Sequence, residues 1–277
     1  MTFLQAFILG IVQGITEFMP ISSSGHTILI PFFLNWQLPD KEMFIFNVLV
    51  ELGTLVAIIL YFRKTLFDII SGFIQGLLKG QPFGTLSARL GWLLILATIP
   101  AGIAGLLLRD LFEQIYTSPL ITGIALLVTA ALLITAERIS LKMNETHDIT
   151  VTSALFIGVM QSLALVPGIS RSGSTISGGM FRHLKRESAG RFAFLMSVPV
   201  MLAAGSLSTY QMITEVPDLA SFLPIMAVGF LTALVVGYLV IRWLLQFLVK
   251  NSLAYFSIYC SIVGTLTIVL WFLQRSL

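Results

Sequence analysis

The residues of this chain best suited to chemistry lie in a polar stretch, GVMQSLALVPGISRSGST at 158–175, which interrupts an otherwise apolar sequence. Its single arginine, Arg171, offers the planar fork of donors that binds phosphate through two hydrogen bonds. Hydroxyls around it add donors, and glycines let backbone N–H groups turn toward an oxyanion; these residues are Ser170, Ser172, Thr175, Gly168 and Gly173. A helix beginning near Ser172 would direct its positive end at the same place. The stretch predicts an anion site with the donor capacity that a phosphate needs.

A second polar stretch, GIVQGITEFMPISSSGHT at 10–27, carries an acid that could complete such a site. Gln13 and Glu17 are four residues apart and share one face of a helix. A carboxylate at bilayer depth is costly unless it is paired, hydrated or bound to a cation. Glu17 is therefore a functional candidate, and a structural ion pair with Arg171 is the alternative; the two interpretations are compatible. Gln13 could share metal-bound water with Glu17 or satisfy a backbone group.

Three serines and a histidine follow in the same stretch. Ser22, Ser23 and Ser24 could simply cap a helix, since serine is a favoured N-cap residue. His26 favours a catalytic role for these residues over simple capping, because a histidine beside hydroxyls can act as nucleophile, base or leaving-group acid. A hydrogen-bonded core histidine is the alternative.

The composition identifies the solvent around these stretches. The 277 residues are 57% hydrophobic and 10% charged, against about a quarter charged in soluble domains, and the mean hydropathy is +0.96. Too few polar residues remain to form a shell, so we expect one integral membrane domain over 1–277. The net charge of +3 comes from Lys and Arg scattered between apolar runs, which indicates a cytoplasmic-side bias and no nucleic-acid partner. The lone Cys260 rules out an internal disulfide.

Apolar runs define the elements that must position the polar stretches. A bilayer core of about 30 Å needs about 20 residues per span, and six runs qualify: 44–62, 90–108, 119–136, 192–209, 222–241 and 255–273. Two further segments, 3–34 and 154–180, are interrupted by Pro, Gly and Ser near the middle. We interpret both as re-entrant helical hairpins, because unwound backbone at membrane depth survives only inside protein or beside a watery cavity. The expected fold class is an all-α polytopic membrane protein.

The two interrupted segments resemble each other. At an offset of 148, eight of nineteen positions are identical: Gly10, Gln13, Ile21, Ser22, Ser24, Gly25, Thr27 and Ile28 match Gly158, Gln161, Ile169, Ser170, Ser172, Gly173, Thr175 and Ile176. Three full spans follow each copy, and an odd number of crossings turns the second copy over. We therefore expect an inverted-topology repeat of about 1–140 and 150–277, each half a re-entrant hairpin plus three transmembrane helices. Chance similarity is the alternative.

Loop charges predict the orientation. Arg63, Lys64, Lys79 and Arg89 follow the first span, the region 138–191 is also basic, and the link at 210–221 holds only two acids. By the positive-inside rule the loops after spans one, three and five face the cytoplasm. The N-terminal hairpin then opens outward, and the site faces the outer side.

These residues together resemble the signatures of a known family. QGITE at 13–17 with PISSSGH at 20–26, and PGISRSGST at 167–175, match the (E/Q)xxxE and PGxSRSxxT motifs of the bacitracin-resistance family of undecaprenyl-diphosphate phosphatases. The likeness covers nearly the whole chain, including ISGGM at 176–180 and FLMSVPVM at 194–201. It implies hydrolysis of undecaprenyl diphosphate in the bacterial plasma membrane, which recycles the lipid carrier for cell-wall synthesis and confers bacitracin resistance. It also implies a divalent cation, Mg²⁺ or Ca²⁺.

The resemblance marks functional positions in this chain. The positions that it carries over are Gln13, Glu17, Ser23, Ser24, His26, Ser170, Arg171, Ser172 and Thr175. We expect Arg171 to hold the terminal phosphate with the surrounding hydroxyls and backbone N–H groups, and Glu17 to bind the cation, with Gln13 as a second candidate ligand. The nucleophile is left open between Ser23, His26 and a water, and His26 serves as base or acid in the other two cases.

Two departures and one rival function remain. Gln13 is the uncharged variant of its motif position and leaves fewer carboxylates for a metal. Glu51, four residues after Asn47, lies where some members of the family have a glutamine, and it could supply the missing acid or pair locally.

Inverted repeats with broken helices also occur in transporters, so a transporter or flippase of lipid phosphate or ions is the alternative. The lipid tail is expected to need only a lateral opening, and the sequence leaves the oligomeric state open, a homodimer included.

Overall fold

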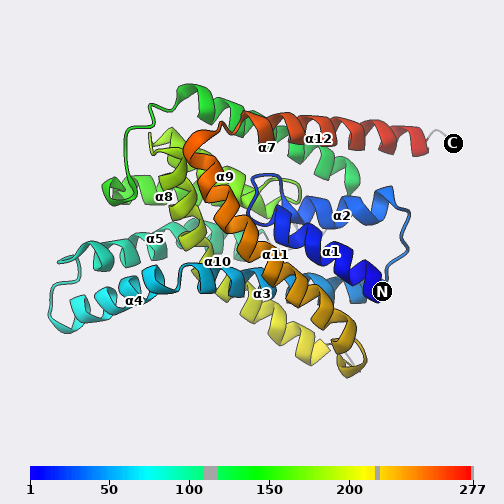
Figure 1. The fold of residues 1–277 in the computed structure, drawn as a ribbon, viewed down its shortest axis with the longest axis horizontal. Helices are drawn as coiled ribbons and strands as arrows, with labels where there is room; N and C mark the ends of the chain where they lie inside the picture. The colour runs from blue at the N-terminus through cyan, green and yellow to red at the C-terminus, as the bar shows by residue number, and fades with distance from the viewer. Residues whose placement is uncertain (109–117, 216–218, 276–277) are drawn as a thin grey trace.

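The computed structural model describes residues 1–108, 118–215 and 219–275, and within these ranges the chain is helical and forms no strand. Figure 1 shows the arrangement. The helices are α1 (Phe3–Thr16), α2 (Ser23–Phe33), α3 (Asp40–Tyr61), α4 (Arg63–Leu78), α5 (Leu86–Leu107), α7 (Pro119–Ile139), η1 (Thr146–Asp148), α8 (Val151–Ser162), η2 (Leu163–Leu165), α9 (Arg171–Phe181), α10 (Arg186–Glu215), η3 (Leu219–Ser221), α11 (Leu223–Lys250) and α12 (Ala254–Arg275).

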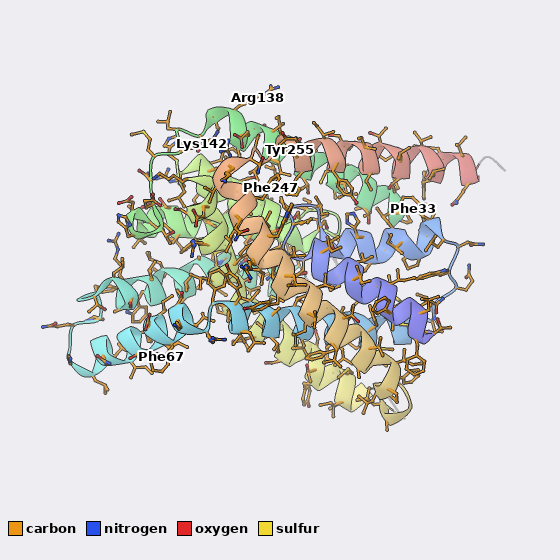
Figure 2. All side chains as sticks on the ribbon, viewed as in Figure 1. Phe33, Phe67, Arg138, Lys142, Phe247 and Tyr255 are labelled. Carbon is orange, nitrogen blue, oxygen red and sulfur yellow. The ribbon has the colours of Figure 1, made fainter. Side chains whose placement is uncertain are left out.

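Six of these helices are long and apolar enough to cross a membrane, as the sequence predicts. The segments are Met43–Tyr61, Leu86–Leu107, Pro119–Ile139, Arg186–Thr214, Leu223–Lys250 and Ala254–Gln274. Apolar side chains also cover much of the outer surface, and Figure 2 shows Phe33 and Phe67 at the periphery, with exposed fractions of 40% and 71%. Such a surface suits lipid as the outer solvent.

The two interrupted segments form pairs of short helices joined by irregular turns. The longest of the four, α1, has 14 residues, a length of about 21 Å at 1.5 Å per residue, which is too short to cross a bilayer core of about 30 Å. Each turn contains one residue in the left-handed region: Ser22 has φ 73° and Gly168 has φ 97°. The predicted interruption of both segments is therefore confirmed.

One helix differs from the sequence-based expectation. The charged connection after the first span contains α4, which packs against α5 through Phe73 and Trp92, whose ring centroids lie 5.0 Å apart. Ile69 is buried while Phe67 faces outward. The segment holds too many polar residues to pass as a span, and its apolar residues recur at helical rather than continuous spacing, so hydropathy alone does not reveal it.

The most extensive helix–helix contacts join the two halves of the chain. Helix α1 packs on α11, α8 packs on α5, α7 packs on α12, and α3 lies against both α10 and α11. In Figure 1, α1 and α2 lie on one side of the molecule, and α7 and α12 run together along one edge.

Small residues allow two of these crossings to be close. A Cβ on Gly10 would lie 2.8 Å from the carbonyl oxygen of Gly229 on α11, and a Cβ on Gly158 would lie 2.3 Å from that of Ala97 on α5. In lipid the hydrophobic effect does not drive helices together, and the van der Waals packing that close backbone approach allows stabilises their association instead. The short helices are thus held by contacts that only glycine permits.

A partly buried acid joins three helix ends at one end of the bundle. Glu137, near the end of α7, accepts hydrogen bonds from Arg186 at the start of α10 and from Lys142, whose Nζ lies 2.5 Å away. It also accepts one from the backbone N–H of Leu253, 3.1 Å away, just before α12. Lys142 and Arg138 lie at this end in Figure 2.

Replacing Gly158 with leucine is expected to destabilise the protein by about 1–3 kcal/mol or more, because the new side chain would collide with backbone of α5 rather than with a side chain that can move. The matched control is Gly102→Leu on α5, since a Cβ there meets no atom within 4 Å. Thermal unfolding in detergent measures both. Equal melting temperatures for the two variants would contradict the close crossing.

Candidate functional site

The two irregular turns meet inside the bundle. The hydroxyl of Ser172 donates to the backbone carbonyl of Met19 at 2.9 Å. A Cβ built on Gly25 would lie 3.3 Å from the Cα of Gly168, so the turns touch through backbone as well. Residues separated by about 150 positions in the sequence are thus direct neighbours, as the sequence predicts.

The two turns have the same pattern of local hydrogen bonds. In each, the N-cap serine accepts from the glycine three residues on, a serine pair shares a hydrogen bond, and a threonine hydroxyl donates to a serine carbonyl. The bonds are Gly25 N to Ser22 Oγ, Ser22 Oγ with Ser24 Oγ and Thr27 Oγ1 to Ser24 O in one turn, and Gly173 N to Ser170 Oγ, Ser170 Oγ with Ser172 Oγ and Thr175 Oγ1 to Ser172 O in the other. Serine as N-cap satisfies a free N–H of the helix start, so the repeated residues build the same cap twice.

An ion pair joins the two turns. The guanidinium of Arg171 donates through Nη2 to Oε1 of Glu17. The other oxygen, Oε2, accepts from the side-chain amide of Gln13 at 3.0 Å and from the hydroxyl of Ser23 at 2.6 Å. The Glu17 side chain is 6% exposed and that of Arg171 is 20% exposed. The expected pairing of these two side chains is therefore present, with both carboxylate oxygens occupied.

The space beside this pair is small. A cavity of about 10 Å³ is lined by Glu17, Arg171, Ser172 and Thr175, and by Ser197 and apolar residues of α10. A cavity of this size holds about one water molecule. The cavity itself is too small for a phosphate, which must therefore displace groups that line it.

A second acid faces the same charges. Glu51 lies on α3, and its charge interacts with those of Glu17 and Arg171. One guanidinium cannot neutralise two carboxylates, and oxygen donors from Glu17, Glu51, Gln13 and Ser23 suit a hard cation, which in Mg²⁺ sites often takes only one or two protein carboxylates. Within the described ranges no three Asp, Glu, His or Cys residues gather in one place. The donor set thus fits a cation that also uses substrate oxygens and water.

His26 lies outside the lining of this cavity. Its Nδ1 is 2.7 Å from the carbonyl oxygen of Ser22, and its Nε2 is 2.7 Å from the hydroxyl of Tyr259 on α12. A carbonyl can only accept, so Nδ1 carries the hydrogen and Tyr259 donates to Nε2. This assignment is that of the neutral imidazole, and the bond to the carbonyl braces Ser22 in its left-handed conformation immediately before Ser23.

The remaining predicted residues build the turns rather than line the cavity. Ser24 bonds Ser22, and Ser170 caps α9. The N–H of Gly173 is taken by that cap. Gly168 lies against α7, where a Cβ would be 2.5 Å from the carbonyl oxygen of Thr122.

Two residues that contact the site, Tyr259 and Met201, lie outside the two signature motifs. Tyr259 comes from α12, far from both motifs, and Met201 of α10 places its sulfur 3.3 Å from Arg171 Nη2. Met201 lies within FLMSVPVM at 194–201, the segment that also resembles the family. That resemblance could have pointed to α10, whereas nothing in the pattern of α12 points to Tyr259.

A helical, multi-pass membrane protein with a buried acid–guanidinium pair between two hydroxyl-rich turns has the features of a membrane-embedded anion site. Comparison with known proteins defines the class further. Residues 6–266 match the model of the family described as bacitracin resistance protein BacA, and the chain belongs to this family.

Curated relatives agree along nearly the whole length. A protein of Methanosphaera stadtmanae is 40% identical over 276 residues, covering 96% of this chain and 97% of the relative. A protein of Chlorobaculum tepidum is 39% identical over 271 residues, covering 95% of each chain. One of Moorella thermoacetica is 40% identical over 275 residues, covering 99% of this chain and all of the relative. All three are named undecaprenyl-diphosphatase.

Replacing Tyr259 with phenylalanine is expected to free Nε2 of His26 and to speed its acylation by diethyl pyrocarbonate, because the hydroxyl that donates to that nitrogen is removed. Mass spectrometry of the His26 peptide measures the rate. Tyr255→Phe, one turn earlier on α12 and 63% exposed, is the matched control and should react like the wild type. Identical rates in both variants would show that Tyr259 does not occupy Nε2.

Proposed function

We propose that this protein is a membrane phosphatase that hydrolyses undecaprenyl diphosphate to undecaprenyl phosphate and inorganic phosphate. Its membership of the BacA family and the names of its relatives support this substrate. The observation that carries the proposal is the Arg171–Glu17 pair at the meeting point of the two turns. The reaction returns the lipid carrier to cell-wall synthesis, and its turnover confers bacitracin resistance.

Phosphate binding begins with an exchange of partners. The terminal phosphate replaces Glu17 at the guanidinium of Arg171, since a diphosphate offers more charge and a bidentate geometry. The N-terminus of α9 faces the same place and adds the positive end of its dipole. The hydroxyls of Ser172 and Thr175 line the cavity, and they turn from their backbone acceptors to the phosphate.

The exchange would leave Oε1 of Glu17 free for a cation. Glu17 and Glu51 would supply carboxylate oxygens and Gln13 its amide oxygen, and a bound Mg²⁺ or Ca²⁺ would neutralise charge on the two phosphates. Gln13 therefore would remain a cation ligand, and Glu51 on α3 would supply the second carboxylate that Gln13 cannot.

Ser23 is the nucleophile that the geometry favours. Its hydroxyl donates to Oε2 of Glu17 at 2.6 Å, which is a nucleophile–base arrangement, and the amide of Gln13 orients the same oxygen. The oxygen of Ser23 attacks the terminal phosphorus, its proton passes to Glu17, and the bond to the leaving undecaprenyl phosphate breaks. Water then attacks the phosphoserine, the Ser23 oxygen leaves and takes the proton back from Glu17, and inorganic phosphate is released. His26 acts by positioning, because it braces Ser22 next to the nucleophile.

The arrangement of the chain in the membrane follows from the internal repeat. Gly10 and Gly158 occupy equivalent positions and make equivalent close crossings with the second span of the other half, on α11 and α5. The matching bonds in the two turns support the same relation. We infer an inverted-topology repeat whose short helix pairs re-enter from opposite faces of the plasma membrane. The basic loops of the first half favour a site that opens to the outer side.

Replacing Arg171 with alanine is expected to lower phosphate release by roughly 10³-fold or more, the scale seen when a transition-state arginine is lost. Release of phosphate from undecaprenyl diphosphate by purified protein in detergent is the measurement. Arg191→Ala removes a surface arginine that pairs with Glu187 on its own helix, and it should keep wild-type turnover. A wild-type protein that moves lipid phosphate across vesicles without releasing phosphate would support the transporter alternative instead.

Cation binding is expected to depend on both acids. Glu17→Gln and Glu51→Gln should each weaken the affinity for Mn²⁺ by roughly tenfold or more. Loss of a residue that only hydrogen-bonds a metal ligand already costs about 10–100-fold in affinity, and loss of a ligand itself costs no less. Electron paramagnetic resonance of free Mn²⁺ measures this without turnover. Glu145→Gln, an acid outside the spans and paired to Lys185, is the control. Unchanged affinity in Glu51→Gln would remove α3 from the cation site.

A further inference from the structure

An apolar groove runs between α3 and α10 on the side of the bundle. It encloses about 400 Å³, and its walls come from Leu52 and Leu55 on α3 and from Leu202, Gly205, Ser206 and Thr209 on α10. At its far end Tyr210 and Ile213 are 66% and 65% exposed. The groove therefore opens on the surface that we expect to face lipid.

The near end of the groove adjoins the catalytic pair. Leu202 directly follows Met201, whose sulfur lies 3.3 Å from the guanidinium of Arg171. On α10 the groove thus begins one residue beyond a side chain that contacts Arg171.

The walls offer hydrocarbon and little polar capacity. Gly205 creates the depth, because even a Cβ at this position would lie 3.0 Å from Cδ2 of Leu52. The hydroxyl of Ser206 donates to the backbone carbonyl of Leu202 at 2.6 Å and is thereby satisfied within its own helix. The groove therefore suits an apolar chain.

We propose that the groove holds the first isoprene units of the substrate, with the attached diphosphate at Arg171. This inference rests on the proposed function and replaces the expectation that the tail needs only a lateral opening. A chain esterified to a phosphate at the guanidinium would pass Met201 and enter the groove beside Leu202. The remainder of the chain leaves the groove near Ile213 and lies in the bilayer.

The groove contributes orientation more than affinity. Lipid tails are as apolar as its walls, so moving a prenyl chain from bilayer to groove gains little hydrophobic free energy. A fixed chain instead sets the direction in which the bridging phosphate oxygen leaves, in line with attack by Ser23. Misplacement of the reacting atoms by about 1 Å can cost roughly 10²-fold in rate, so the groove is expected to act on kcat.

Photo-crosslinking locates the chain without requiring turnover. A farnesyl methylenediphosphonate with a diazirine on its first isoprene unit is irradiated with the wild-type protein, and the labelled peptides are mapped by mass spectrometry. We expect labels at 52–55 and 202–213, competed by undecaprenyl diphosphate. Labels on other helices overturn the proposal, as does equal labelling of the groove by a diazirine-bearing phosphatidylglycerol, which would make it a site for any lipid chain.

Matched variants test the effect on rate. Ser206→Phe fills the groove from an exposed position, whereas Ala204→Phe adds the same ring at an exposed position of α10 that does not line it. Ser206→Phe should lower kcat for undecaprenyl diphosphate at least tenfold and weaken the crosslink, and Ala204→Phe should change neither. Gly205→Leu fills the floor as a second variant. Equal kcat in all three overturns the proposal, whereas a wild type that releases no phosphate while the crosslink stays in the groove refutes the proposed function alone.

Discussion

The pairing of one carboxylate with one guanidinium inside the apolar bundle is the constraint on which the structure depends. Glu17 belongs to the first turn and Arg171 to the second. Removal of either partner would leave a buried charge alone, which typically costs about 3–5 kcal/mol. The two turns must therefore meet, and the close crossings at Gly10 and Gly158 bring the short helices that carry them to within reach.

The two related segments keep one scaffold and divide the chemistry between them. Their capping serines, glycines and threonines coincide, yet Glu17, Ser23 and His26 align at the offset of 148 with Leu165, Arg171 and Ser174. One copy thus carries the acid and the hydroxyl beside it, and the other carries the guanidinium. A site built in this way is complete only when both copies face each other, because neither contains both charges.

Much of this could be predicted because lipid makes strict demands on sequence. Long apolar runs, and short ones broken at Pro20 and Pro167, follow directly from the need to satisfy backbone groups in a bilayer. Helix α4 could not be predicted from hydropathy, since charged and polar residues interrupt its apolar ones and leave no continuous apolar run. At the site, the Arg171–Glu17 pair was foreseeable from charge alone. The partner of His26 was not, because the contact depends on how α12 is rotated about its axis.

The junction at Glu137 bears on that rotation. The bond from the N–H of Leu253 to Glu137 anchors the chain where α12 begins, and Tyr259 comes six residues later, about one and two-thirds turns along the helix. Because each residue advances the helix by about 100°, the azimuth of the phenol is determined at this anchor. Glu137 thus helps to set the rotation of α12 about its axis. Through that rotation, an acid at one edge of the bundle contributes to bringing the Tyr259 hydroxyl to His26, beside the proposed nucleophile.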